Sequence, residues 1–415
     1  MPSLDTDPNR IQFVPGISGP NIVAGEGCWL IADDGRRILD AAGGAIVANI
    51  GHGRRVVADA VRDALDGGAY VIPLWPTPNR AALYDALVER WLPEGMGHVF
   101  FTSGGSESAE SALRLARAYH VASGRPERWK VIGRDPSYHG LTLGALAVGS
   151  HRGRRAGYEP PLVDFPTVPW DDAAAVADVI EREGADSIAA FLFEPITGAA
   201  GACLQPPDDY WLAVEDVCRR NDILLIADEV MTGFGRTGRC WGHDHLPITP
   251  DVLYGGKGLG GGYVPIGMVS ATDEVVASLE GSGFMFFTFT GSDAMCAGAL
   301  AVLDVIEAEH LVDRSAAMGE VLATRLDDAL GGHPDVVDIR GHGLFRGIEL
   351  TPSGGRFTAA VVAECLARDM WIYPAGSGPV PDGVMIGCPL VVTEGEIELI
   401  VETLAGAISA VAATR

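Results

Sequence analysis

The chain joins an apolar strand directly to a lysine set among glycines in the segment Val252-Leu253-Tyr254-Gly255-Gly256-Lys257-Gly258-Leu259-Gly260-Gly261-Gly262. A strand that is apolar at every position is typical of one covered on both faces of a sheet. The glycines after it let the backbone turn tightly or approach a ligand closely. A desolvated amine in such a place is a nucleophile that forms a Schiff base with an aldehyde. The segment therefore predicts a reactive Lys257 at the end of a buried strand.

Two phosphate-binding motifs fail on this segment. A Walker-type loop ending at Lys257 requires a glycine at position 251 and a hydroxyl at position 258, but the chain has Asp251 and Gly258 there. A dinucleotide fingerprint formally matches three of the glycines, but a helix should follow it, and Gly262-Tyr263-Val264-Pro265 breaks a helix. Neither phosphate-binding motif therefore accounts for Lys257, and the reactive lysine remains the interpretation of this segment.

The chain around this segment alternates between short apolar runs and amphipathic stretches. The expected strands are 99–102, 131–132, 188–193, 223–227, 252–254 and 266–270, and the expected helices include 81–91, 107–122 and 209–219. Buried strands joined through helices indicate an α/β fold with a mostly parallel sheet and helices on both faces. In such a fold ligands bind at the carboxyl ends of the strands.

The C-terminal part has another pattern, with expected helices at 294–308, 310–330 and 394–412 and expected strands at 345–350 and 384–386. We therefore expect a large α/β domain over residues 56–310 and a smaller α+β domain made from residues 1–55 and 311–415.

Two further strand ends carry polar groups. The strand ending at Thr102 leads into Ser103-Gly104-Gly105-Ser106-Glu107 at a helix start, where free N–H groups and the helix dipole attract an anion such as phosphate. A tight turn with an ordinary N-cap is the alternative. The strand 223–227 leads into Asp228-Glu229, and a carboxylate there can pair with a protonated ring nitrogen or simply anchor a loop. Taken with Lys257, these signals predict pyridoxal 5′-phosphate, whose three handles are a phosphate, a pyridine nitrogen and an aldehyde.

Charge and composition exclude several other classes of protein. The 415 residues include 30 basic and 55 acidic side chains, a net charge of −25, which argues against nucleic-acid and anionic-membrane partners. No apolar segment reaches membrane-spanning length, and the N-terminus does not have the pattern of a signal peptide, so we expect a cytoplasmic protein. The seven scattered cysteines and the histidines lack metal-ligand spacing, so we expect no metal site.

The sequence resembles the class III, or ω-amino-acid, aminotransferases of fold type I over essentially its whole length, and most closely their amine- and β-alanine:pyruvate-like branch. The resemblance rests on Leu39-Asp40, Gly51-His52, Ser103 to Glu107, Tyr138 to Thr142, Glu194 to Gly198, Asp228 to Gly238, Lys257 to Gly262, Thr288 to Gly291 and Arg340 to Leu350.

The resemblance implies a role for each matching residue. Lys257 would carry the cofactor and move protons, and Asp228 would pair with the pyridine nitrogen. The other cofactor-binding residues would be Gly105, Ser106, Tyr138, His139, Glu194, Val230 and, from the neighbouring subunit, Thr288. The active unit would then be a homodimer, which could pair further into a tetramer. Core or strand packing is the competing interpretation for Tyr138, Val230 and Thr288.

The substrate is less well defined. Met385 stands where ornithine- and γ-aminobutyrate-type members place an arginine for the α-carboxylate, and Met231 replaces their glutamine, which argues against those substrates. Tyr70, Leu74 and Trp75 fall where the amine:pyruvate branch places pocket residues, with core packing as the alternative. No residue for the keto-acid carboxylate is identifiable.

These observations predict a ping-pong transaminase that takes nitrogen from a primary amine or ω-amino acid and delivers it to a small keto acid such as pyruvate. An amino-acid mutase or decarboxylase on the same scaffold is the alternative, and a pyridoxal-phosphate-binding protein without turnover is a third.

Overall fold

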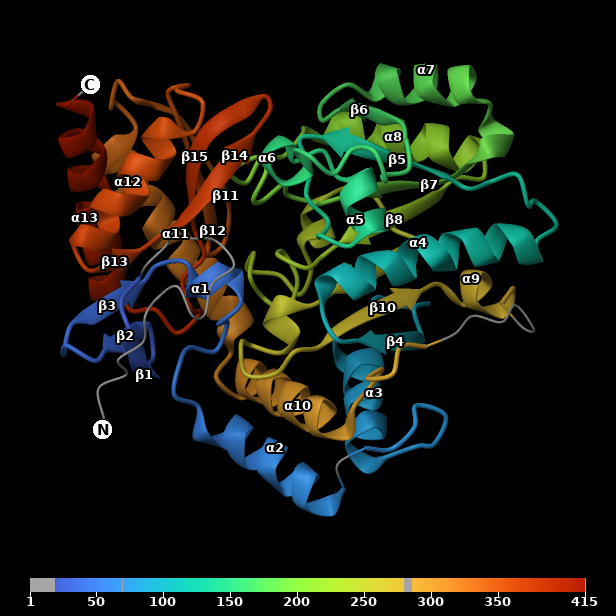
Figure 1. Ribbon diagram of the computed structural model, residues 1–415, viewed down its shortest axis with the longest axis horizontal. Helices are drawn as coiled ribbons and strands as arrows, with labels where there is room; N and C mark the ends of the chain where they lie inside the picture. Colours follow the sequence, from blue (N-terminus) through green and yellow to red (C-terminus); the bar gives the residue numbers. More distant parts are fainter. Residues whose placement is uncertain (1–18, 69, 280–285, 415) are drawn as a thin grey trace.

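A seven-stranded sheet forms the centre of the larger part of the molecule (Figure 1). The computed structural model describes residues 19–68, 70–279 and 286–414. The sheet has the strand order β4–β10–β9–β8–β7–β5–β6. Its strands are β4 (His98–Thr102), β5 (Lys130–Asp135), β6 (Thr167–Pro169), β7 (Ile188–Phe193), β8 (Leu224–Asp228), β9 (Val252–Gly255) and β10 (Gly267–Ala271). Only β10 pairs antiparallel with its neighbours, so the expected mostly parallel sheet is confirmed.

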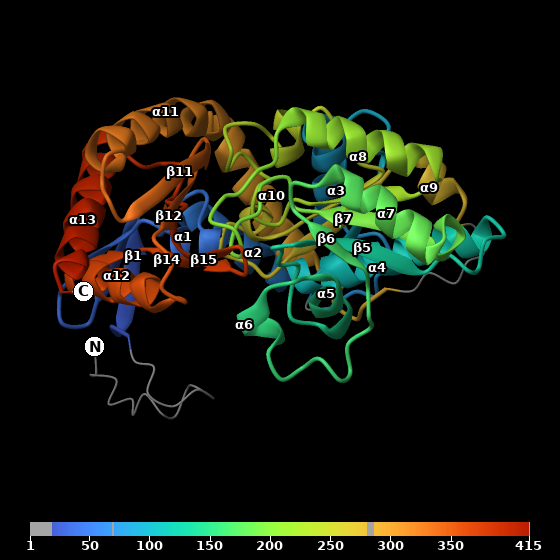
Figure 2. The same cartoon turned by 90° about the horizontal axis from the view of Figure 1, so that it is seen from above.

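Helices cover both faces of this sheet, as Figure 2 shows. On one face, Ala112 and Leu115 of α4 (Gly105–Ala122) pack in one cluster with Leu192. On the other, Trp211 of α8 (Asp208–Arg220) packs in a second cluster with Phe193. The alternation of Leu192 and Phe193 between the clusters follows from the period of two along a strand. The remaining helices of this part are α2 (Arg55–Gly67), α3 (Pro78–Arg90), α5 (Leu143–Val148), α6 (Arg152–Arg155), α7 (Ala173–Glu183), α9 (Asp273–Ala277) and α10 (Asp293–Ala308), with short 3-10 turns η2 (Ala185–Ser187), η3 (Gly242–His245) and η4 (Lys257–Leu259).

Two four-stranded sheets form the second part, on the left of Figure 1. The first, ordered β1–β2–β3–β13, combines β1 (Ile22–Glu26), β2 (Trp29–Ala32) and β3 (Arg37–Asp40) with β13 (Met370–Trp371). The second, ordered β11–β12–β15–β14, consists of β11 (Val336–His342), β12 (Phe345–Leu350), β14 (Tyr373–Ser377) and β15 (Val380–Ile386). The helices are α1 (Gly43–Ile46), α11 (Leu311–Leu330), α12 (Arg356–Ala367) and α13 (Glu394–Ala412).

The N-terminal strands join the C-terminal part because β3 pairs in parallel with β13, with Leu39 opposite Met370. The proposed domain limits, 56–310 against 1–55 and 311–415, stay a prediction, and residues 1–18 of the smaller range lie outside the described residues.

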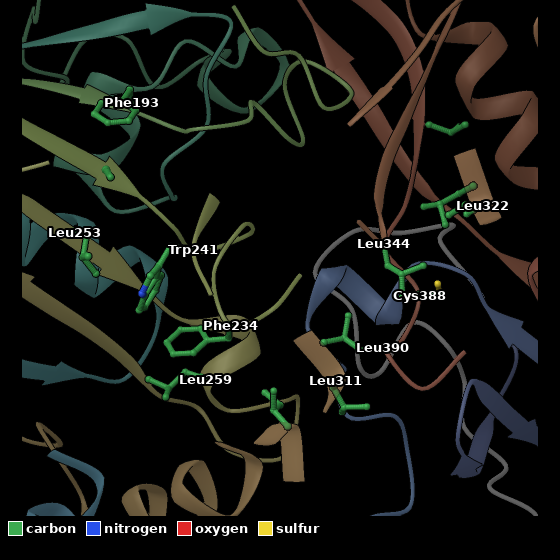
Figure 3. Close-up of a cluster of buried hydrophobic side chains, with 14 of the residues drawn as sticks. Phe193, Phe234, Trp241, Leu253, Leu259, Leu311, Leu322, Leu344, Cys388 and Leu390 are labelled. Atoms are coloured by element: carbon green, nitrogen blue, oxygen red, sulfur yellow. The ribbon is translucent and has the colours of Figure 1, made fainter. Parts of the chain in front are cut away.

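The hydrophobic core runs across the junction between the two parts. Figure 3 shows Phe234, Trp241 and Leu259 on one side and Leu344, Cys388 and Leu390 on the other, all within one buried cluster. The rings of Phe234 and Trp241 lie 4.8 Å apart at a steep angle. This continuous core fixes the loop after β8 against both parts, beside the carboxyl ends of the strands.

Among the described residues, no helix is both long enough and apolar enough to cross a membrane.

Candidate active site

A cavity of about 190 Å³ lies at the carboxyl edge of the seven-stranded sheet. The structure brings the following residues predicted from the sequence around it: Gly105, Ser106, Tyr138, His139, Glu194, Asp228, Val230 and Lys257. Gly140 and Met231 complete its lining. The strand ends and the α4 start that were expected to converge therefore do so in the folded chain.

Lys257 lies one residue beyond β9, after Gly256, and begins the turn η4. Its φ of +39° lies in the left-handed region, which is unfavourable for a residue with a side chain and is often found at functional sites. The neighbouring glycines are needed for close packing, because a Cβ at Gly258 would meet Asn49 Nδ2 at 2.5 Å. Burial lowers the pKa of Lys257 to about 8, and the charge of Arg154 adds to this lowering, against the opposing effect of Asp228 and Glu194. The neutral amine is then a minor but appreciable fraction near physiological pH and the main form above about pH 8.

Asp228 is the last residue of β8, and its buried carboxylate is held by three hydrogen bonds. Oδ1 accepts the Val230 N–H at 3.0 Å, and Oδ2 accepts the Tyr254 hydroxyl at 2.7 Å and pairs with His139 Nδ1 at 2.7 Å. These bonds fix the orientation of the carboxylate toward the cavity edge. Tyr254 was not singled out from the sequence, since an apolar strand gave no reason to treat it as other than core.

His139 has one ring nitrogen in use and one without a partner. Its Nδ1 lies 2.7 Å from Asp228, whereas its buried Nε2 has no hydrogen-bond partner among the described residues. Buried polar atoms are rarely left unpaired, and an unpaired one beside a cavity suggests a bound group or water.

The N-terminus of α4 also lines the cavity, through Gly105 and Ser106. The helix begins at Gly105, and the Glu107 carboxylate accepts the Ser103 N–H at 2.9 Å, which holds the turn before it. The Leu141 N–H donates to Ser106 Oγ at 3.3 Å. A Cβ at Gly105 would meet Val230 at 3.0 Å, so the backbone approaches the cavity wall closely. Free N–H groups of a first helical turn form a site for an anion.

Glu194 and Glu229 are both buried acids, but they differ in their partners. Among the described residues, Glu194 accepts two backbone N–H groups, from Tyr138 at 3.0 Å and Gly198 at 3.1 Å, and burial raises its pKa. Burial would also raise the pKa of Glu229, but hydrogen bonds from His243 and Thr232 outweigh it and lower the pKa. Glu194 lines the cavity, whereas Glu229 fixes the loop that carries Val230 and Met231.

The other predicted residues do not reach this cavity within one chain. Thr288 is exposed, and Tyr70, Leu74 and Trp75 are 52%, 71% and 66% exposed. The Tyr70 hydroxyl donates to the Thr288 carbonyl at 3.0 Å, and its ring meets Phe289 edge-on with centroids 6.2 Å apart. Tyr70 therefore joins the loop before α3 to the segment before α10, and the two form one partly apolar surface.

Within the described residues, no cluster of three or more His, Cys, Asp or Glu side chains is arranged to hold a metal ion.

Comparison with known proteins identifies the family of this chain. The model of the aminotransferase class-III family matches residues 18–408. The hypotaurine/taurine–pyruvate aminotransferase of Paracoccus denitrificans is 34% identical, over 94% of this chain and 91% of that protein. The acetylornithine aminotransferase of Mycolicibacterium smegmatis is 35% identical, over 92% of each chain. The crystal structure of an (S)-enantioselective ω-transaminase from Thermomicrobium roseum matches with a TM-score of 0.89 and 34% identity, covering 95% of this chain and 93% of that one.

Proposed function

This chain belongs to the class-III aminotransferases, and from that membership we propose that it moves an amino group from a primary amine or ω-amino acid to a small keto acid such as pyruvate, in a ping-pong reaction with pyridoxal 5′-phosphate. The observation that carries the proposal is the cavity itself. It joins an amine of lowered pKa, a fixed carboxylate and a helix N-terminus, one for each handle of that cofactor.

The donor groups of the cavity fit this cofactor. The N–H groups at the start of α4, together with Ser106, would hold the phosphate, and Asp228 would hold the ring nitrogen in its protonated form. The Tyr138 ring and the Val230 side chain would flank the ring. The unpaired His139 Nε2 leaves one further donor or acceptor at the same edge.

When bound, pyridoxal 5′-phosphate supplies an aldehyde for amines and a ring that accepts electrons from the carbon losing its proton. Lys257 supplies the base, because its amine is neutral at pH values above about 8 and can take a proton from the substrate α-carbon and return one. Three hydrogen bonds hold the Asp228 carboxylate in place, so it does not need to reorganise as charge develops on the ring.

We further propose that the active unit is a homodimer. Leu74, Trp75 and Phe289 are 71%, 66% and 63% exposed in the single chain, and exposed apolar patches on monomers often mark protein interfaces. Burying this surface against a second copy would bring Thr288 of one chain to the phosphate end of the other.

Residues near the cavity favour the amine:pyruvate type of substrate over acetylornithine. Sequence identity does not separate them, since relatives of both types match at 34% and 35%. Met385, which stands where the ornithine-type members place an arginine, is fully buried in an apolar cluster with Met231 and Phe345. No cation is therefore available at that position for an α-carboxylate.

The first test uses the fact that the chain has only two lysines, Lys130 and Lys257. The protein is incubated with pyridoxal phosphate, reduced with borohydride, digested and analysed by mass spectrometry. We expect the cofactor on Lys257 alone. Lys130 serves as the internal control, because it is engaged with Glu183 at 2.8 Å. Cofactor on Lys130, or on neither lysine, would contradict the proposed site.

The second test follows the visible spectrum of the holoenzyme with a panel of amines and ω-amino acids, and then with pyruvate or 2-oxoglutarate. A donor should bleach the cofactor band, and a keto acid should restore it. Loss of the band without restoration by any keto acid, with release of carbon dioxide or of an isomerised amino acid, would instead identify the decarboxylase or mutase reaction.

A further inference from the structure

Arg154 is a cation that has no acidic partner among the described residues, and it lies beside the proposed active site. It belongs to the short helix α6, and its guanidinium carbon lies 4.1 Å from the centre of the Tyr138 ring, which lines the cavity. Nη2 donates to the Tyr373 hydroxyl at 3.3 Å. Within the described part of the chain, no Asp or Glu oxygen lies within 4.0 Å of this guanidinium, in a protein with 55 acidic residues.

The neighbouring arginine behaves in the ordinary way. Arg152, two residues earlier in α6, is exposed and pairs with Asp135 at 3.4 Å. Arg154 instead is half-buried, with its guanidinium over the ring of Tyr138 and hydrogen-bonded to the Tyr373 hydroxyl. A guanidinium offers five N–H donors in a planar fork that matches a carboxylate. Within the described residues the side-chain hydrogen bonds of Arg154 go to tyrosine hydroxyls, to Tyr373 at 3.3 Å and to Tyr138, so donors of the fork are left for an anion.

The surroundings of Arg154 leave few other groups for an anionic substrate. Tyr138 and Tyr373 pack against the apolar cluster that contains Met231 and Met385. The acids that line the cavity, Asp228 and Glu194, repel a carboxylate rather than bind it. Arg154 packs on the ring of Tyr138, and Tyr138 lines the same cavity as Lys257, which places the guanidinium at the edge of that cavity.

We propose that Arg154 binds the carboxylate of the keto acid that accepts the amino group, and of any donor that carries a carboxylate. This inference rests on the proposed transamination. Arg154 would therefore act in the half-reaction with the keto acid, which always has a carboxylate, and not in the half-reaction with a simple primary amine, which has none. The Tyr373 hydroxyl positions the Arg154 guanidinium. Because Met385 cannot bind a carboxylate, the cation for it comes from α6 instead.

The test compares Arg154→Gln and Arg154→Leu with the matched control Arg152→Gln, all as holoenzymes. One single-turnover measurement uses 1-phenylethylamine, which has no carboxylate, and the other uses pyruvate with the aminated enzyme. We expect the Arg154 variants to bind pyruvate about 10- to 100-fold more weakly, the usual range for losing a charge-assisted pair. The amine half-reaction and the Arg152→Gln variant should change little.

A binding measurement independent of turnover completes the design. Acetate, an unreactive carboxylate, is titrated into each holoenzyme by calorimetry, and its affinity should fall in both Arg154 variants. If Arg154→Leu does not fold, Arg154→Gln, which can still bond to Tyr373, carries the same expectation. An equal loss in both half-reactions, a loss of cofactor affinity, or unchanged pyruvate and acetate affinity would each overturn the inference.

The outcomes also separate this inference from the proposed function. If the wild-type enzyme transaminates and the Arg154 variants keep full pyruvate affinity, only the inference fails. If the wild-type enzyme turns over no donor and acceptor, the proposed function fails, and the acetate titration alone decides whether Arg154 forms a carboxylate site.

Discussion

Two regions of the chain carry residues predicted for one active site, and they differ in how they are held. At the carboxyl edge of the large sheet, Asp228 is buried and accepts three hydrogen bonds, and its neighbours line one cavity. In the loop before α3, Leu74 and Trp75 are 71% and 66% exposed. The first region is organised by a single chain. The second has the character of a surface that is completed by another molecule.

The largest effect that tests this comparison is the loss of Lys257 at the sheet edge. Lys257→Ala is expected to lower kcat/KM for transamination by about 10³-fold or more, because both the amine that binds the cofactor and the base are removed. Steady-state kinetics with the responding donor and keto acid measure it. Lys130→Ala is the control and should retain activity. A Lys257→Ala enzyme with nearly normal turnover would show that the cavity is not the active site.

A second prediction concerns the pH dependence of the same amine. Because burial lowers the pKa of Lys257 from 10.5 to about 8, the rate at which the apoenzyme binds pyridoxal phosphate should rise with pH and level off above about 8. Stopped-flow absorbance measures this rate. The folded apoenzyme is destabilised by the buried ammonium below that pKa, and the penalty disappears as pH rises toward 10.5. A midpoint near the ordinary lysine value would mean that the amine is solvated.

The exposed loop gives the third prediction. Replacing Leu74 and Trp75 together with serine should raise the dimer dissociation constant at least about tenfold, because large apolar side chains at interface centres carry much of the binding energy. Sedimentation equilibrium measures it. Leu212→Ser is the matched control, since Leu212 is 54% exposed on α8 and should not affect assembly. Equal dimer stability in the double variant and the control would remove the contrast between the two regions.

The smallest expected effect is a difference in stability between variants of two buried acids at the sheet edge, Glu229 and Glu194. Glu229→Gln should lower the free energy of unfolding of the apoenzyme by about 1–3 kcal/mol, because an amide group would face the N–H donors of Gly242 and His243. Glu194→Gln should lower the free energy of unfolding less. Burial disfavours the charged form of Glu194 and raises its pKa, so replacing the acid with a neutral amide offsets part of the loss from the weakened hydrogen bonds. Urea unfolding at neutral pH compares them. A larger loss of unfolding free energy for Glu194→Gln than for Glu229→Gln would mean that Glu194, and not Glu229, is the acid that stabilises the fold.

Most of the fold could be predicted from the sequence, because period and apolarity mark its elements clearly. The expected ranges 188–193, 345–350 and 394–412 coincide with β7, β12 and α13. The reversed direction of β10 was not predicted, since strand direction follows from connections rather than from the residues of a strand. The strands β1 to β3 were also missed. The residues of β1 and β2 are largely exposed or intermediate and give little apolar pattern, and β3, although mostly buried, has only four residues.

The site divides in a similar way. Lys257, Asp228 and the glycines could be predicted as site residues, because their residue types and their positions at strand ends are visible in the sequence. The bond from Tyr254 to Asp228 and the placement of Arg154 on Tyr138 join residues far apart in the sequence. Nothing in the local pattern marks them, because a tyrosine within an apolar strand and an arginine in a basic run have common structural explanations. Only the fold brings them beside the cavity.

The pairing of β3 with β13 bears on how the protein is made. Leu39 lies opposite Met370, so β3 leaves the ribosome long before its partner strand is synthesised. Until then one edge of β3 presents unpaired backbone groups, the kind of edge that recruits strands from other chains. Contacts so distant in sequence form slowly, and domains that need them are exposed to aggregation while they wait. Production of this protein should therefore benefit from slow expression and chaperones more than from changes to its core.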